Sequence, residues 1–281
     1  MYNNVMKLRT LLQYSLPHQL LSRVIGYFTK CKQPWFKNIL IHWFIKRYKV
    51  DLKDVEKTDF ASFNEFFTRS LKPETRPIVQ DEKAIACPID GYISQIGVIE
   101  KDQMIQAKNY KYNLKNLIGD DENLFVDGNF ATLYLSPRDY HRVHMPITGK
   151  LQKMTYVPGK LFSVNPLTVQ EIPNLYTKNE RIITIFETEI GQMAMVLVGA
   201  MLVASIATVW AGAITPAKQK TIQTWDYIDQ DIILKRGAEM GRFQFGSTVI
   251  LLFPKNKLLW DKFSVGDSIK MGQSLGVLVT A

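Results

Sequence analysis

The sequence predicts an α+β protein in which N-terminal amphipathic helices precede a mainly-β body of packed antiparallel sheets. Two observations predict this fold class. Apolar residues recur at helical spacing in the first quarter of the chain. After residue 82, short apolar runs alternate with glycine and proline at a spacing of roughly 8–12 residues, which is typical of sandwiches and barrels.

Length and composition indicate a globular protein. A chain of 281 residues can bury a sizeable core in one large domain or two smaller ones. Its apolar fraction of 46% and charged fraction of 22% argue against disorder. Cys31 and Cys87 have no CxxC spacing, so we expect neither a disulfide framework nor a zinc cluster, and a reducing compartment. No cleavable signal pattern is present at the N-terminus.

The net charge of +9 is concentrated in the N-terminal segment, residues 1–50. This segment contains 9 of the 35 Lys and Arg residues and no Asp or Glu, so the remaining 26 basic residues balance all 26 acidic ones. Such segregation of charge indicates a polyanionic partner for this part of the chain.

The same segment carries helical stripes of apolar residues. Basic amphipathic helices of this kind are typical of segments that lie in a membrane interface, so we expect residues 1–50 to bind anionic lipid. A helical cap on the protein's own core, with a solvated basic face, is the alternative. Nucleic acid is disfavoured because neither an RNA-binding signature nor a recognition-helix pattern accompanies the charge. The stripes predict two short helices broken near Pro17 and one longer helix: Leu8, Leu11, Leu12; Leu20, Leu21, Val24, Ile25, Phe28; and Trp35, Phe36, Ile39, Leu40, Trp43, Phe44.

Residues 51–281 are predicted to form the second, catalytic domain. It begins with a helix that places four phenylalanines, at 60, 63, 66 and 67, on one face. Asp59 or Ser62 is expected to cap this helix, and the stretch 72–77 to end it. Strands are expected at 91–97, 130–135, 181–186 and 249–253.

The stretch from Ile190 to Ala217 contains no charged residue and is long enough to span a bilayer. We interpret it as two buried strands, because Gly199 interrupts the first apolar half and Gly212 and Pro216 end the second. Its mixture of Val, Ile, Ala, Thr and Ser also favours a sheet. A transmembrane helix is the alternative.

Two of the chain's four histidines, His141 and His144, lie in a segment bounded by prolines, which favours acid–base chemistry. His18 and His42 belong to the basic N-terminal segment and are interpreted as interfacial. The His-x-x-His spacing could hold a metal ion, but no third ligand is obvious nearby, so we predict no metal site.

Asp90 and Ser247 complete the set of candidate catalytic residues. Asp90-Gly91 resembles a hairpin turn, and Gly246-Ser247 by itself would be a turn that enters a strand. Gly246 has no Cβ, however, so the Ser247 hydroxyl can approach its carbonyl closely. Asp90, a histidine and Ser247 would supply the parts of a Ser-His-Asp relay. The sequence does not show that they meet.

Blocks of sequence over nearly the whole chain resemble the bacterial phosphatidylserine decarboxylases, which are pyruvoyl-dependent. The usual Leu-Gly-Ser-Thr of that family is Phe-Gly-Ser-Thr here, which leaves the reacting pair unchanged. Residues 265–276 look like half of a biotinyl/lipoyl-type hammerhead without a carrier lysine, so we expect a hammerhead-like C-terminal part. The blocks that carry the family resemblance are 63–71 with Arg76-Pro77, 88–91, 136–146, 157–165, 179–181, 209–212 and 241–250.

The resemblance implies that Ser247 attacks the carbonyl of Gly246 and that the chain is cut between them. The products, residues 1–246 and 247–281, remain associated, and Ser247 becomes a pyruvoyl group. In this scheme Asp90 and His144 activate the serine. His141 serves the decarboxylation, as proton donor or as a contact to the substrate phosphate.

The implied enzyme is a carboxy-lyase, made as a self-cleaving proenzyme of phospholipid biosynthesis. It forms phosphatidylethanolamine and carbon dioxide from phosphatidylserine through a Schiff base to the pyruvoyl group. We expect a peripheral protein at the cytoplasmic face of the cell membrane, and a homodimer stays open. A serine hydrolase with the same triad is an alternative, although the Gly-x-Ser-x-Gly elbow is absent. A non-enzymatic adaptor would leave the paired histidines and Gly-Ser unexplained.

Overall fold

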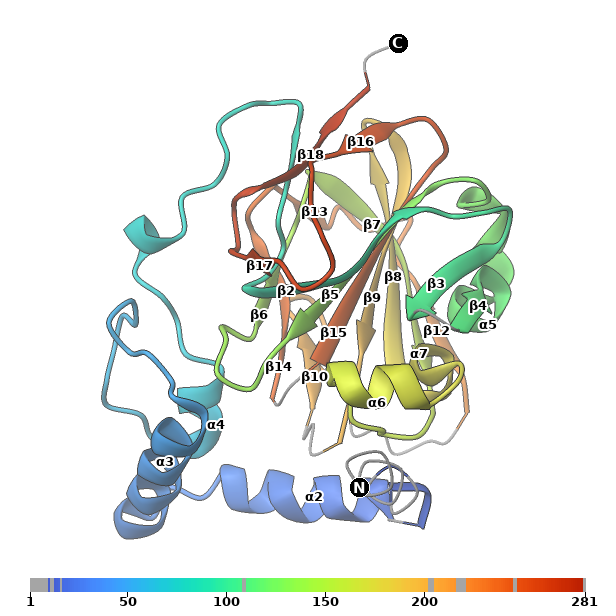
Figure 1. The fold of residues 1–281 in the computed structure, drawn as a ribbon. Helices are drawn as coiled ribbons and strands as arrows, with labels where there is room; N and C mark the ends of the chain where they lie inside the picture. The colour runs from blue at the N-terminus through green and yellow to red at the C-terminus, as the bar shows by residue number, and fades with distance from the viewer. Residues whose placement is uncertain are drawn as a thin grey trace.

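The structure is a computed structural model that describes residue 10 and residues 13–15, 17–107, 110–201, 205–215, 221–244 and 247–279. N-terminal helices precede a body of antiparallel sheets (Figure 1), which confirms the α+β fold class. Several residues used in the sequence predictions lie outside these ranges: Leu8, Leu11, Leu12, Pro216, Ala217, Phe245 and Gly246.

The helices predicted on either side of residue 30 are present as α2, His18–Thr29, and α3, Pro34–Tyr48. α2 begins directly after Pro17, as predicted. α3 has Pro34 in its first turn, where a missing N–H leaves no intrahelical bond unmade. Its C-terminal cap is Lys49, whose φ of 55° is left-handed and stops the helix.

The apolar residues that predicted α3 form two rows on the helix, and these rows meet different surroundings. Phe44 is buried, whereas Trp35 is 68% and Trp43 55% exposed. Neighbouring residues on a helix point about 100° apart, so rows offset by one residue diverge. The helix therefore packs on the protein through one row and leaves the other uncovered.

The short helix α4, Phe63–Phe67, connects α3 to the body. Ser62 caps it by accepting a hydrogen bond from the Glu65 N–H, as one of the two predicted caps. Its phenylalanines pack against Ile41 and Phe44 of α3 in a small second core cluster. This cluster includes residues from both sides of residue 50. The domain boundary drawn there stays a prediction.

A large antiparallel sheet forms the body, in the order β12-β7-β8-β9-β15-β5-β2-β17, with β13 beside β7. The strands predicted at 91–97, 130–135, 181–186 and 249–253 all belong to it. Its strands are β2 (Gly91–Val98), β5 (Asn129–Leu135), β7 (Gly149–Val157), β8 (Arg181–Thr188), β9 (Gly191–Val198), β12 (Gln223–Asp226), β13 (Ile233–Leu234), β15 (Ser247–Phe253) and β17 (Ser268–Ile269).

Smaller sheets and short helices flank this sheet. One sheet has the order β11-β10-β14-β6, another β1-β18-β16, and β3 pairs with β4. Their strands are β1 (Ala84–Ala86), β3 (Gln103–Ala107), β4 (Tyr110–Asn113), β6 (Arg142–His144), β10 (Ile206–Thr208), β11 (Gly212–Ala213), β14 (Glu239–Phe243), β16 (Leu258–Trp260) and β18 (Ser274–Leu278). The helical turns are η1 (Pro73–Thr75), α5 (Leu114–Ile118), η2 (Gly119–Leu124), α6 (Pro166–Glu171) and α7 (Leu175–Lys178).

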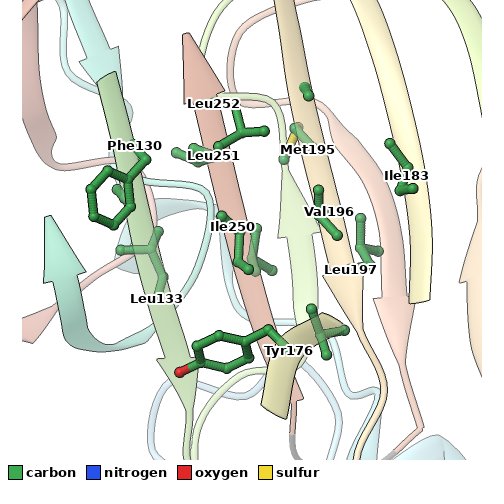
Figure 2. Packing of buried hydrophobic residues seen from close by; sticks show 14 of the residues in the cluster. Phe130, Leu133, Tyr176, Ile183, Met195, Val196, Leu197, Ile250, Leu251 and Leu252 are labelled. Atoms are coloured by element: carbon green, nitrogen blue, oxygen red, sulfur yellow. The ribbon is translucent and has the colours of Figure 1, made fainter. Parts of the chain in front are cut away.

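The main core lies on the central strands, where Figure 2 shows Ile250, Leu251 and Leu252 of β15 between Leu133 of β5 and Val196 of β9. The uncharged stretch after Ile190 forms the two predicted strands, β9 and β10, and also the short exposed strand β11, which the sequence did not predict because Gly212 was expected to end the second strand. Within the described ranges, no helix is long and apolar enough to cross a membrane.

Candidate active site

Ser247 is the first residue of β15, a central strand of the large sheet. It lies opposite Leu135 of β5, and Thr248 next to it pairs with both Tyr134 and Val198. Pairing on both sides fixes the start of this strand. Ser247 is 0% exposed, and its Oγ has no hydrogen-bond partner among the described residues. A buried hydroxyl without a partner is costly, so this position needs a reason other than stability.

The segment with the two histidines reaches the same end of the sheet. It follows directly from Leu135, the partner of Ser247, and continues into β6. β6 pairs with β14, and the Phe243 N–H donates to the His141 carbonyl at 3.0 Å. The chain is therefore tied to His141 four residues before Ser247, although Phe245 and Gly246 themselves lie outside the described residues.

His141 is fully buried under α4, with the ring of Phe67 centred 4.1 Å from its own. Its Nδ1 lies 2.9 Å from the Asp139 carbonyl, which can only accept, so Nδ1 carries the proton. Nε2 then has a bare lone pair and no partner. Burial lowers the pKa of His141 to about 3, so the ring is neutral at physiological pH.

His144 has a partner on each ring nitrogen. Nδ1 lies 2.8 Å from the Gly237 carbonyl and so donates, which leaves Nε2 to accept from the Tyr140 hydroxyl at 3.0 Å. Burial lowers the pKa of His144 and raises that of Tyr140, so both groups are neutral. The histidine is poised as a base, but Tyr140 occupies the nitrogen that would act.

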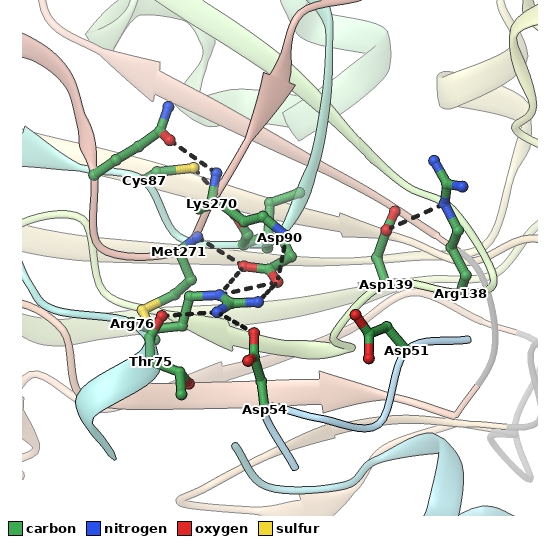
Figure 3. Close-up of polar contacts among 12 residues, drawn as sticks. Asp51, Asp54, Thr75, Arg76, Cys87, Asp90, Arg138, Asp139, Lys270 and Met271 are labelled. Atoms are coloured by element: carbon green, nitrogen blue, oxygen red, sulfur yellow. Dashed lines mark hydrogen bonds and ion pairs between the residues drawn. The ribbon is translucent and has the colours of Figure 1, made fainter. Parts of the chain in front are cut away.

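Asp90 is 3% exposed and is held by charged and backbone donors. Arg76 donates from Nε and Nη2 to its carboxylate, the latter at 2.6 Å, and the Met271 N–H donates to Oδ1 at 2.9 Å. Figure 3 shows these contacts, together with Asp54 on the other side of Arg76 and Lys270 at 3.7 Å. The hydrogen bond to Asp90 raises the pKa of Arg76, so the guanidinium stays charged.

The register of the large sheet places Asp90 and Ser247 at the same end. Tyr92 of β2 lies opposite Tyr134 of β5, one residue from the Leu135–Ser247 pair. β2 and β15 flank β5, so their backbones are separated by two strand spacings, about 10 Å. Yet in the described part of the chain, Asp90, His141, His144 and Ser247 form no hydrogen bond with one another. The relay stays a prediction.

Sequence reasoning singled out neither Arg76, as the partner of Asp90, nor Tyr140 and Gly237, as partners of His144. Arg76-Pro77 belonged to the blocks that resemble the family, but the sequence assigned no function to Arg76. Tyr140 is four residues from His144, and Gly237 is 93 residues away. Among the described residues, no group of three or more His, Cys, Asp and Glu side chains could hold a metal ion.

Comparison with known proteins identifies related sequences over almost the whole chain. A family model described as phosphatidylserine decarboxylase matches residues 63–277, and a second, described as PSD, matches residues 8–49. The phosphatidylserine decarboxylase proenzyme of Shewanella pealeana is 50% identical over 279 residues, which are 96% of this chain and 96% of that protein. That of Pseudomonas aeruginosa strain PAO1 is 50% identical over 274 residues, 94% of this chain and 95% of the relative.

Proposed function

Because the chain belongs to the phosphatidylserine decarboxylase family, we propose that it is a self-cleaving proenzyme that converts phosphatidylserine to phosphatidylethanolamine and carbon dioxide in phospholipid biosynthesis. The observation that carries the proposal is the state of Ser247. A fully buried hydroxyl with no partner, at the start of a strand fixed on both sides, is a group held for reaction.

The cofactor in this proposal is a pyruvoyl group made from Ser247. When formed, it would take up the substrate amine as a Schiff base and act as the electron sink for decarboxylation. The residues present fit such a group. The burial of Ser247 would keep water from it, and the orphaned Oγ has no bond that its conversion would break.

Association of the two cleavage products follows from the sheet. β15 lies between β5 and β9, and each of its residues is buried. β18 pairs with β1, and β17 pairs with β2. The short chain 247–281 would therefore stay bound through many backbone hydrogen bonds and a large apolar contact after the cut.

In the proposed division of labour, Asp90 and His144 activate Ser247 and His141 serves decarboxylation. The neutral His144 supports a base, provided that Tyr140 releases Nε2. Both roles proposed for His141 need a proton on Nε2, which is bare in this arrangement. An incoming anionic substrate would favour protonation of Nε2, since a nearby negative charge raises the pKa of a histidine.

We also propose that the N-terminal helices hold the enzyme on the cytoplasmic face of the cell membrane as a peripheral protein. Trp35, Ile39 and Trp43 form an exposed row on α3, and Leu20, Val24 and Tyr27 are exposed on α2. In Figure 1, α2 lies below the end of the sheet where β15 begins. His18 fixes α2 there, because its Nδ1 accepts from the Leu161 N–H at 3.2 Å.

Denaturing mass spectrometry of the purified, active protein tests the proposed function. We expect two chains, residues 1–246 and residues 247–281, the second beginning with a pyruvoyl group instead of serine. A single 32.3 kDa chain with unmodified Ser247, from material that releases carbon dioxide, would overturn the proposed cofactor.

Vesicle sedimentation tests the membrane proposal. Replacing Trp35, Ile39 and Trp43 with serine should release the protein from vesicles of anionic lipid, because the exposed row loses its apolar area. Serine at the exposed apolar residues Ile222 and Ile228 is the matched control. Equal binding by both variants would contradict this orientation.

A further inference from the structure

The last residue of α4 and the two residues that follow it hold the segment that carries His141. The ring of Phe67 is centred 4.1 Å from the His141 ring. The Thr68 carbonyl accepts from Arg142 Nε at 2.9 Å. Arg69 reaches in the opposite direction and donates from Nη2 to backbone carbonyls of the same segment. Because the contacts run both ways, the histidine segment is fixed against the end of α4.

Arg69 holds two successive carbonyls in this segment. Its Nη2 lies 2.8 Å from the Arg138 carbonyl oxygen and 3.1 Å from that of Asp139. The Asp139 carbonyl is also the one that accepts from His141 Nδ1 at 2.9 Å. A carbonyl oxygen has two lone pairs, so it can accept both hydrogen bonds. The guanidinium of Arg69 and the ring of His141 therefore share one acceptor.

The direction of the Asp139 carbonyl decides where His141 carries its proton. The backbone N–H of Asp139 donates to the Ser136 carbonyl at 2.9 Å, and the Ser136 N–H donates to Asp139 Oδ2 at 2.8 Å. This turn fixes the N-terminal side of Asp139, and Arg69 fixes its carbonyl side. Since a carbonyl can only accept, His141 Nδ1 keeps the proton. Nε2, which is buried without a partner among the described residues, keeps the lone pair.

Arg181 shows how a buried arginine with a purely structural role differs from Arg69. The two residues are 5% and 4% exposed, and burial lowers the pKa of each guanidinium to about 10. Arg181 donates from Nε, Nη1 and Nη2 to four backbone carbonyls. Arg69 Nε, by contrast, is buried with no partner in the described ranges. Hydrogen bonding alone therefore does not account for the buried charge of Arg69.

The charge of Arg69 acts on the same ring that its hydrogen bonds position. Burial has the largest effect on the pKa of His141 and lowers it. The hydrogen bond to the Asp139 carbonyl raises this pKa, and the positive charge of Arg69 lowers it. Arg69 thus acts with burial against protonation. The ring stays neutral, with one defined proton, until a negative charge comes close.

We propose that Arg69 is a positioning residue for His141: it holds the Asp139 carbonyl in place, which keeps the ring proton on Nδ1 and the lone pair on Nε2. Arg69 acts through this carbonyl and is not itself a catalytic residue. That His141 serves decarboxylation rests on the proposed function. The dependence of the ring proton on Arg69 does not, so the two can be tested separately.

Nuclear magnetic resonance of the full-length Ser247→Ala chain, with ¹⁵N-labelled histidine, tests the position of the proton. The ring ¹⁵N chemical shifts at neutral pH show which nitrogen carries it. His141→Gln identifies the His141 signals among those of the four histidines. Arg69→Met removes both the guanidinium and its charge, and Arg69→Lys keeps a charge without the planar fork. Arg181→Met is the matched control, because Arg181 is equally buried and bonds other carbonyls.

We expect His141 to be protonated on Nδ1 alone when Arg69 is present. Arg69→Met should give a mixture of the two neutral tautomers, Arg69→Lys a smaller proportion of the second tautomer, and Arg181→Met no change. A native tautomer in Arg69→Met would overturn the proposal, as would an equal mixture in Arg181→Met. If urea unfolding shows that Arg69→Met does not fold, Arg69→Lys decides, and an unchanged tautomer in that variant would overturn the proposal.

Turnover of the cut protein with its native Ser247 gives a second readout. Arg69→Lys should lower kcat for carbon dioxide release on the order of tenfold and leave KM nearly unchanged, because a misplaced His141 ring affects the reaction step. A raised KM with an unchanged kcat would assign Arg69 to substrate binding and overturn the positioning role. If the native protein released no carbon dioxide, the proposed function would fail, and the tautomer of His141 would still decide the role of Arg69.

Discussion

The two ends of the candidate active site differ in how far their polar groups are satisfied. At the Asp90 end, both carboxylate oxygens accept from Arg76, and Oδ1 also accepts from the Met271 N–H. At the Ser247 end, Ser247 Oγ, Thr248 Oγ1 and His141 Nε2 are all buried without a partner among the described residues. The Asp90 end is therefore built to hold a charge in place.

The Ser247 end is built to keep groups available. An unpaired buried donor or acceptor costs about 1–3 kcal/mol, and several lie within a few residues of the predicted cut. Such a cluster is retained only where stability is not the selected property. Stability and reactivity are therefore assigned to two different sides of one candidate site, so substitutions on the two sides should separate them.

Ser247→Ala should have the largest effect on cleavage and little effect on stability. We expect no self-cleavage, because the attacking oxygen is gone, and a folded single chain, because that oxygen has no partner to lose. Denaturing mass spectrometry reports the cut, and a cooperative urea transition reports the fold. An unfolded Ser247→Ala chain would show that the hydroxyl has a structural role and would break the contrast.

Asp90→Asn should lower both stability and cleavage. In the uncut Ser247→Ala background, we expect a loss of about 3 kcal/mol in the free energy of unfolding, because the largely buried Arg76 guanidinium loses its buried carboxylate and keeps only the more exposed Asp54. In the native chain, self-cleavage should slow on the order of 10⁴-fold, the effect of neutralising a relay carboxylate. Pulse labelling measures the rate of self-cleavage, and urea unfolding measures the free energy of unfolding.

Asp231→Asn is the matched control for this change. Asp231 forms an ion pair with Lys150, but its side chain is 87% exposed, so we expect little change in the free energy of unfolding. If Asp90→Asn were equally mild, the Arg76 contact would not be the anchor that its burial indicates.

The two histidines should separate cutting from turnover. His144→Ala should slow self-cleavage roughly 10²-fold or more through loss of the base. His141→Ala should cut and then release carbon dioxide slowly. Gel analysis of pulse-labelled chains and carbon dioxide release measure the two steps. An uncut His141→Ala chain would reverse the assignment and make the bare Nε2 of His141 the base for Ser247.

Local features of the fold could be predicted from the sequence, and long-range contacts could not. The helix that starts after Pro17, the Ser62 cap and the strand at 249–253 follow from periodicity and capping rules that act over a few residues. α3 shows the limit. Its apolar residues marked a helix, but not that Phe44 would be buried and Trp43 exposed.

The candidate site shows the same limit more sharply. Its residue types and blocks pointed to Asp90, His144 and Ser247, but their partners come from distant parts of the chain. Met271 is 181 residues from Asp90, and Gly237 is 93 residues from His144. No sequence periodicity encodes such contacts, because they arise when strands far apart in the chain become neighbours in a sheet.

Of these substitutions, Tyr140→Phe should change the rate of self-cleavage least. The direction of that change is the most informative. The Tyr140 hydroxyl donates to His144 Nε2, so it competes with Ser247 for the base. Removing one hydrogen bond of about 0.5–1.5 kcal/mol should speed self-cleavage a few-fold. Because burial lowers the pKa of His144 below 6.5, the wild-type rate should be flat near neutral pH and fall only on acidification below that value.

The pH dependence of self-cleavage shows whether the Tyr140 hydroxyl restrains His144 or helps it to act. The hydroxyl stabilises the neutral ring, so its loss should raise the pKa of His144 and move the acid limb of Tyr140→Phe to higher pH. Following pulse-labelled chains between acidic and neutral pH measures both the rate of self-cleavage and the pH at which that rate falls. If Tyr140→Phe cut itself more slowly and its acid limb stayed at the same pH, Tyr140 would help to assemble the relay. The part of the site whose polar groups are hydrogen-bonded would then include His144 as well as Asp90.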